Sequence, residues 1–162
     1  MKILVLSDSH SGLSFMRRCI DKLQPQHVIH LGDHYDDATA MAEEHPHIRF
    51  HQVPGNCDSF LRQPGMVDIM CYPIGGIKIY MTHGHKHFVK SGIHRLVEDA
   101  SQHEPQAILF GHTHEALCFQ RENGTWVMNP GSCRSWGGTV GLIEVEDGKI
   151  SACRILGQTD MD

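Results

Sequence analysis

The fold of this chain is decided by the stretch Ala107-Ile108-Leu109-Phe110-Gly111-His112-Thr113-His114. Its four apolar residues predict a buried strand, and Gly111 ends it. His112 and His114 are two residues apart, and in an extended backbone this spacing places both side chains on one side. Two imidazoles at the carboxyl end of a strand suit a metal ion better than a hydrophobic core.

The composition indicates one folded domain spanning residues 1–162, since 40% of the residues are hydrophobic and 20% are charged. The net charge of −5 argues against nucleic acid or an anionic membrane as a partner. No apolar run approaches the ~18 residues of a membrane span, and Asp8 interrupts the first apolar run too early for a signal peptide. We therefore expect a cytoplasmic protein. Its six cysteines form no C-x-x-C motif and are expected to be reduced thiols rather than a disulfide framework.

The first third of the chain alternates between strand and helix patterns. Apolar runs at residues 3–6, 28–31 and 48–53 predict strands, and residues 13–24 and 37–44 have helical spacing. Repeated strand–helix units predict a parallel sheet.

The rest of the chain is dominated by hairpin patterns. Runs at 66–74 and 77–81 flank Gly75-Gly76, and a helix is expected over 91–103. Two further hairpins are predicted over 116–128 and 140–155. We expect two sheets, one rich in parallel and one in antiparallel pairs, with helices outside. Exposed hairpin edges would suit a homo-oligomer, and the polar residues 157–162 are expected to fray.

Five predicted strand ends carry side chains that bind metals. They are Asp8, His10, Asp33, Asn56, His83, His112 and His114. In open α/β sheets, ligands bind at the carboxyl ends of the strands. Three oxygen donors and four imidazoles are too many for one tetrahedral ion and fit two divalent ions about 3.5–4 Å apart. Asp33 is expected to bridge them, because Gly32 permits close backbone approach. The alternative is that the Asp and Asn residues only cap turns and helices, which leaves the histidines unexplained.

Five segments resemble, in order, the signature of the calcineurin-like metallophosphoesterases, and the resemblance extends to about residue 135. These segments are Asp8-Ser9-His10, Gly32-Asp33, Gly55-Asn56-Cys57-Asp58, Thr82-His83-Gly84-His85 and Gly111-His112-Thr113-His114. The loop Asn129-Pro130-Gly131-Ser132 is similar to one in the small bacterial and archaeal phosphodiesterase branch. The resemblance implies an α/β fold, namely a four-layer α-β-β-α sandwich of two mixed sheets flanked by helices.

The resemblance also implies a ligand set and a reaction. One ion would bind Asp8, His10, Asp33 and His114, and the other would bind Asp33, Asn56, His83 and His112. Manganese is expected, with nickel, zinc or iron as alternatives. The implied function is a metal-dependent phosphodiesterase, with phosphatase activity also expected, in which a hydroxide bridging the ions attacks a small phosphodiester or nucleotide-like substrate. Asn56 would hold both metal and phosphate, since an amide offers an acceptor oxygen and a donor NH₂ group.

The chain departs from the family pattern at Cys57, where many members have a histidine that helps to protonate the leaving group. The proton donor is left open among a metal-bound water, His85 and Asp58. A substrate with a good leaving group would need no proton donor. The alternatives are a hydrogen bond to a ligand for His85 and a loop cap for Asp58. Arg134 and His87 are candidate substrate contacts. Their alternatives are a surface ion pair and a solvent-exposed rim residue.

A second function class is a non-catalytic, metal-binding scaffold for protein interactions, of the retromer-subunit type. Scaffold relatives show altered metal positions, whereas all seven positions are present here. A hydrolase of the metallo-β-lactamase type is excluded, because the sequence has no H-x-H-x-D-H run.

Overall fold

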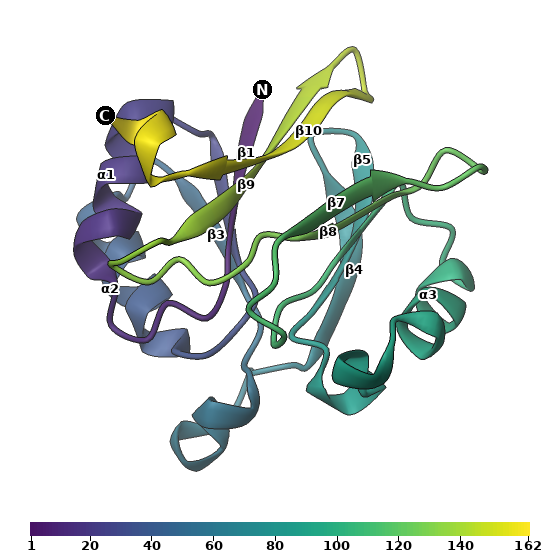
Figure 1. The fold of residues 1–162 in the computed structure, drawn as a ribbon, viewed down its shortest axis with the longest axis horizontal. Helices are drawn as coiled ribbons and strands as arrows, with labels where there is room; N and C mark the ends of the chain where they lie inside the picture. Colours follow the sequence, from purple (N-terminus) through teal and green to yellow (C-terminus); the bar gives the residue numbers. More distant parts are fainter.

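The computed structural model describes residues 1–60 and 62–162 with their side chains. Two five-stranded sheets face each other, and helices cover their outer sides (Figure 1). The first sheet contains β1 (Lys2–Leu6), β2 (His27–His30), β3 (Arg49–Gln52), β9 (Thr139–Glu146) and β10 (Lys149–Gly157). The second contains β4 (Ile69–Ile74), β5 (Ile77–Thr82), β6 (Ala107–Leu109), β7 (Leu117–Gln120) and β8 (Trp126–Asn129).

Both sheets are mixed. The first has the order β10-β9-β1-β2-β3, in which β1, β2 and β3 are parallel and β9 runs antiparallel to β1. The second has the order β4-β5-β6-β8-β7, in which β5, β6 and β8 are parallel and the two outer strands are antiparallel. These sheets confirm the predicted four-layer sandwich.

Alternating residues of β1 show why the first sheet is buried on both faces. Ile3 and Val5 lie in the core between the sheets, whereas Leu4 and Leu6 lie in a core beneath the helices. That core is covered by α1 (Leu13–Leu23) and α2 (Tyr35–Glu44). A continuous apolar run is what a strand between two buried layers requires.

The outer face of the second sheet is covered by α3 (His94–Ser101). Tyr80 and Ile108 of the sheet pack in one cluster with Leu96 and Ala100 of the helix. Three short 3₁₀ helices lie in the connections of this half of the chain: η1 (Asn56–Leu61), η2 (His85–His87) and η3 (Val89–Ser91). Among the helices of the described residues, none is long and apolar enough to cross a membrane.

Two predictions about the last third of the chain were wrong. The β9–β10 hairpin joins the first sheet, where Ile3 pairs with Ile143, so the sheets do not divide into a parallel-rich and an antiparallel-rich one. The C-terminus does not fray but forms η4 (Gln158–Met161), where the Asp160 carboxylate accepts a hydrogen bond from the Gly157 N–H at 2.7 Å. Met161 is only 4% exposed and packs in the core beneath α1, so one apolar side chain anchors an otherwise polar tail.

Candidate metal centre

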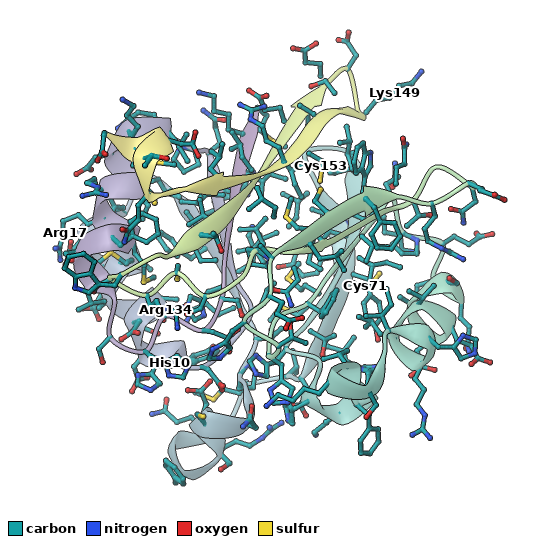
Figure 2. The ribbon with its side chains drawn as sticks, viewed as in Figure 1. His10, Arg17, Cys71, Arg134, Lys149 and Cys153 are labelled. Atoms are coloured by element: carbon teal, nitrogen blue, oxygen red, sulfur yellow. The ribbon has the colours of Figure 1, made fainter. Side chains whose placement is uncertain are left out.

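The seven predicted ligands gather at one end of the sandwich, where the labelled His10 lies (Figure 2). They form two groups, and within each the ligand atoms lie within 4.8 Å of one another. The first group is Asp8, His10 and His114, and the second is Asp33, His83 and His112. The Asn56 Oδ1 atom lies 3.1 Å from His83 Nε2 and so joins the second group.

One carboxylate oxygen of Asp8 accepts no hydrogen bond. Its Oδ2 accepts hydrogen bonds from Ser7 Oγ at 2.6 Å and from the His112 N–H at 3.0 Å. Its Oδ1 is buried without a hydrogen-bond partner, 3.2 Å from His114 Nε2 and 3.9 Å from His83 Nε2. A buried, unpaired carboxylate oxygen is costly unless a cation balances it. The donor set therefore fits divalent metal ions, and this oxygen faces histidines of both groups.

His83 is held in the tautomer that binds metals through Nε2. Its Nδ1–H donates to the Leu31 carbonyl oxygen at 2.7 Å, which leaves Nε2 facing Asp33 Oδ2 at 3.4 Å. Burial lowers the pKa of His83, but the Asp33 and Asp8 carboxylates outweigh burial and raise it. Burial likewise opposes ionisation of Asp33, yet hydrogen bonds from His83 and Cys57 hold its pKa below the usual range.

Two glycines keep space for side chains of the site. A Cβ atom on Gly55 would lie 2.1 Å from Asp33 Oδ1, and one on Gly111 would lie 2.0 Å from Ser7 Oγ. Gly32 has a φ of +102°, and a Cβ there would lie 2.5 Å from the Gly55 nitrogen. The predicted close approach at Gly32 is therefore an approach between two loops of the site.

The backbone of His112 and His114 is not extended. Their φ angles are 71° and 63°, and each side chain joins a different group. The prediction that both rings lie on one side was wrong, because the strand ends at Leu109 and the following residues turn. His112 joins the group of Asp33 and His83, and His114 joins that of Asp8 and His10; that each group holds an ion stays a prediction.

Asp58 is a loop cap, which corrects its prediction as a proton donor. It is 2% exposed and accepts backbone hydrogen bonds from Asp33 at 2.9 Å, Tyr35 at 2.9 Å and Gly55 at 2.7 Å. Both carboxylate oxygens are therefore engaged by backbone N–H groups of the loops that carry Asp33 and Asn56.

His87 is buried and does not face the metal centre. It is 5% exposed, and its Nε2 lies 3.1 Å from Asp99 Oδ2 and 3.4 Å from Tyr80 Oη. His87 is therefore neither the predicted substrate contact nor an exposed rim residue. It packs against α3 instead.

His85 lies beside the ligands. Its ring centroid is 5.4 Å from that of His83 and 6.1 Å from that of His112, and its Nδ1 is buried without a partner. Burial and the neighbouring His83 lower its pKa. Cys57 is exposed, and partial burial together with Asp33 raises the pKa of its thiol to about 11. A thiol with a raised pKa is a weaker acid than an imidazolium, so Cys57 is a poor substitute for the histidine of the family pattern.

The loop at residues 129–134 braces the ligand loops. Ser132 Oγ donates to the Asp8 carbonyl oxygen at 2.7 Å, and Asn129 Nδ2 donates to the Gly111 carbonyl oxygen at 3.0 Å and to Thr113 Oγ1 at 2.9 Å. Arg134, labelled in Figure 2, donates from Nε to the Trp136 carbonyl oxygen at 3.1 Å. This bond differs from the surface ion pair considered as its alternative, and a substrate role for Arg134 stays a prediction.

A buried network of side-chain hydrogen bonds, which no sequence motif indicated, supports the loops that follow β1 and β2. His30 accepts from the Gly32 N–H at 3.2 Å, and its Nε2 lies 2.9 Å from Ser9 Oγ, which donates to Asp37 Oδ2 at 2.7 Å. Burial lowers the pKa of His30 to about 4, so the ring is neutral. The sequence signal was a polar residue at a strand position with apolar neighbours on both sides, Ile29 and Leu31.

The chain is similar in sequence to known proteins over most of its length. Residues 1–148 match the calcineurin-like phosphoesterase superfamily domain. The probable metallophosphoesterase YsnB of Bacillus subtilis is 33% identical over 138 residues, which cover 83% of this chain and 76% of the relative. Phosphodiesterase MJ0936 of Methanocaldococcus jannaschii is 26% identical over 168 residues, covering 90% of this chain and 94% of the relative.

Solved structures share the fold. A predicted phosphoesterase from Streptococcus pneumoniae TIGR4 superposes with a TM-score of 0.74 at 21% identity, covering 97% of each chain. Vps29 of Entamoeba histolytica, complexed with Zn²⁺, has a TM-score of 0.73 at 21% identity, covering 97% of this chain and 99% of the other. The sequence match and the fold together define a metallophosphoesterase. This chain belongs to the calcineurin-like phosphoesterase superfamily.

Proposed function

We propose that this metallophosphoesterase is a dinuclear, metal-dependent phosphodiesterase acting on small phosphodiesters. One observation carries the proposal, namely that two groups of three nitrogen and oxygen donors meet around the unpaired Asp8 Oδ1. A likeness to the M. jannaschii phosphodiesterase supports the choice of diesters.

Asp8, His10, Asp33 and His114 would hold one ion, and Asp33, Asn56, His83 and His112 would hold the other. When bound, two such ions supply Lewis acidity toward phosphoryl oxygens and lower the pKa of water. Manganese is proposed because the donors are carboxylates, an amide and imidazoles without a thiolate, a set that nickel, zinc and iron also accept.

The protein's own groups orient the site. The Leu31 carbonyl oxygen accepts from Nδ1–H and so selects the neutral His83 tautomer whose lone pair is on Nε2, and Asp58 fixes the loops that carry Asp33 and Asn56. Asn56 Oδ1 faces the second group, and the Nδ2 group of the same amide would contact a phosphoryl oxygen. Among the described residues near the ligands, His85 is the candidate for holding a proton near the leaving oxygen, by its position alone.

The test is hydrolysis of bis-p-nitrophenyl phosphate by metal-stripped protein after Mn²⁺ is restored. We expect metal-dependent turnover that exceeds turnover of the matching monoester. Asn56→Ala should lose about 100-fold or more in kcat/KM, as other electrostatic contacts do on removal. The exposed Gln102→Ala is the matched control and should retain wild-type turnover.

A non-catalytic scaffold is the second candidate, and the fold shared with Vps29 is the observation that favours it. A folded protein that holds two ions and hydrolyses neither ester with Mn²⁺, Ni²⁺, Zn²⁺ or Fe²⁺ would support the scaffold. Turnover lost in Asn56→Ala would exclude it.

A further inference from the structure

Two cysteines meet where the edges of the two sheets approach each other, away from the metal ligands. Cys118 lies in β7, the edge strand of the second sheet, and Cys153 lies in β10, the edge strand of the first. Their Sγ atoms are 3.5 Å apart, and Cys118 Sγ is also 3.4 Å from the Cys153 carbonyl oxygen. Figure 2 labels Cys153, whose side chain lies between β10 and β7.

The surroundings of this pair favour reaction between the two thiols. Both side chains are half-buried and pack against the core between the sheets. The other cysteines differ: Cys19 and Cys133 are buried beneath the helices, Cys71 lies in β4, and Cys57 lies beside the metal centre. Among the described residues, only Cys118 and Cys153 bring two cysteine sulfur atoms within hydrogen-bond distance.

We propose that Cys118 and Cys153 are an oxidation site that forms a reversible disulfide between the two sheets when a low-molecular-weight disulfide, such as oxidised glutathione, is the oxidant. The Sγ atoms must approach by only about 1.5 Å to reach the S–S bond length of about 2.05 Å. Side-chain rotation at the two half-buried edge positions supplies this movement.

The exchange proceeds in two balanced steps. The Cys118 thiolate attacks one sulfur of the oxidant, breaking its S–S bond and forming a mixed disulfide, and the released thiolate takes up a proton. The Cys153 thiolate then attacks Cys118 Sγ and releases the second thiol. Two cysteine thiols are oxidised to one disulfide, and one oxidant disulfide is reduced to two thiols. The hydrogen bond between the two thiols lowers the pKa of Cys118, which favours Cys118 as the attacking group.

The bond would close a large loop and fix the strand that follows the ligand loop. The two cysteines are 35 positions apart, and β8 and β9 lie between them. Cys118 follows the ligand His114 by four residues, so the disulfide would anchor β7 directly after the ligand loop. Closing such a loop restricts the unfolded chain and stabilises the folded one.

The test is peptide mapping of the full-length folded protein after incubation with oxidised glutathione, acid quenching and alkylation of free thiols. We expect a peptide in which Cys118 and Cys153 are linked, and its loss after dithiothreitol. The oxidised protein should melt about 5–10 °C higher than the reduced protein. Cys153→Ser should abolish the shift and leave a glutathione adduct at Cys118, whereas Cys71→Ser should retain the shift.

The proposal is overturned if wild-type protein, still folded, yields alkylated Cys118 and Cys153 after the oxidant treatment. It is also overturned if the linked peptide joins either cysteine to Cys57 or Cys71, or if the linked protein melts at the temperature of the reduced protein. The peptide map of the wild type decides the matter even if a serine variant fails to fold.

Discussion

Asp58 carries three backbone hydrogen bonds that fix the two loops around Asp33. Asp58→Asn places an amide NH₂ group against an N–H donor, so we expect a loss of about 2–4 kcal/mol in the free energy of unfolding. We also expect residual turnover to keep the shape of the wild-type pH–rate profile, because a loop cap donates no proton. Urea unfolding and a pH–rate series measure the two effects. Wild-type stability together with loss of one limb of the profile would restore Asp58 as a proton donor.

At the level of single residues, the sequence predicted the candidate metal-binding side chains of the site but not the residues that support them. Each proposed ligand follows a predicted strand, so residue type and position sufficed to nominate the seven residues that the fold brings together. Asp58, His30 and Asn129 act through hydrogen bonds that depend on how separate loops pack. The Asp58 carboxylate reaches the Asp33 N–H across 25 positions, and no local pattern encodes this contact. The buried position of His87 likewise depends on α3, which follows it in the chain.

At the scale of elements, Asp68 joins the segment after η1 to η2. Its carboxylate lies 2.8 Å from Arg62 Nη1 and 2.6 Å from Lys86 Nζ. Hydrogen bonds from Arg62 and Lys86 lower the pKa of Asp68 to about 2, although partial burial opposes ionisation. The contribution of the Asp68 carboxylate to the free energy of unfolding is therefore present above about pH 4 and is lost as the pH falls toward 2.

We expect Asp68→Asn to loosen this connection without unfolding the protein. Amide hydrogen exchange in residues 62–68 should become about 3–10-fold faster, while global stability changes by about 1 kcal/mol or less, as for other exposed ion pairs. Exchange mass spectrometry at pH 7 measures this. Glu98→Gln, which removes an exposed pair within α3, is the control. Unchanged exchange in residues 62–68 would contradict the connection.

Element patterns predicted most strands and helices but not how they assemble. Asn123-Gly124 and Asp147-Gly148 each indicated a hairpin, and both hairpins form. A hairpin's turn residues specify its own pairing, however, and not the sheet that it joins. The β9–β10 hairpin docks on β1 through residues far apart in sequence, so the division of strands between the sheets was predicted wrongly.

At the scale of the whole molecule, a histidine–tyrosine contact links the edges of the two sheets at β3 and β4. His51 of β3 hydrogen-bonds to Tyr72 of β4 and lies 3.0 Å from His27 Nδ1 through Nε2. Burial, and then the neighbouring His27, lower the pKa of His51 to about 4. The unfolded chain, with an ordinary histidine pKa of about 6.5, binds more protons than the folded one, so stability falls as the pH drops from 6.5 toward 4.

We expect His51 to account for about 1–2 kcal/mol of the stability that the metal-free protein loses between pH 7 and pH 5. Urea unfolding in the presence of a chelator measures this loss. His51→Gln should reduce the loss by that amount, even if it lowers stability at pH 7. The exposed His94→Gln is the control and should keep the wild-type dependence. The same pH dependence in His51→Gln as in wild type would contradict this account.

The central claim, that the two groups hold two ions, is tested most directly by metal content per chain. Stripped protein is loaded with Mn²⁺, dialysed and analysed by inductively coupled plasma mass spectrometry. We predict two ions in wild type and in His94→Ala, and about one ion each in His112→Ala and His114→Ala, because each removes a ligand from a different group. A single ion in folded wild type, or two retained ions in both ligand variants, would contradict the dinuclear site.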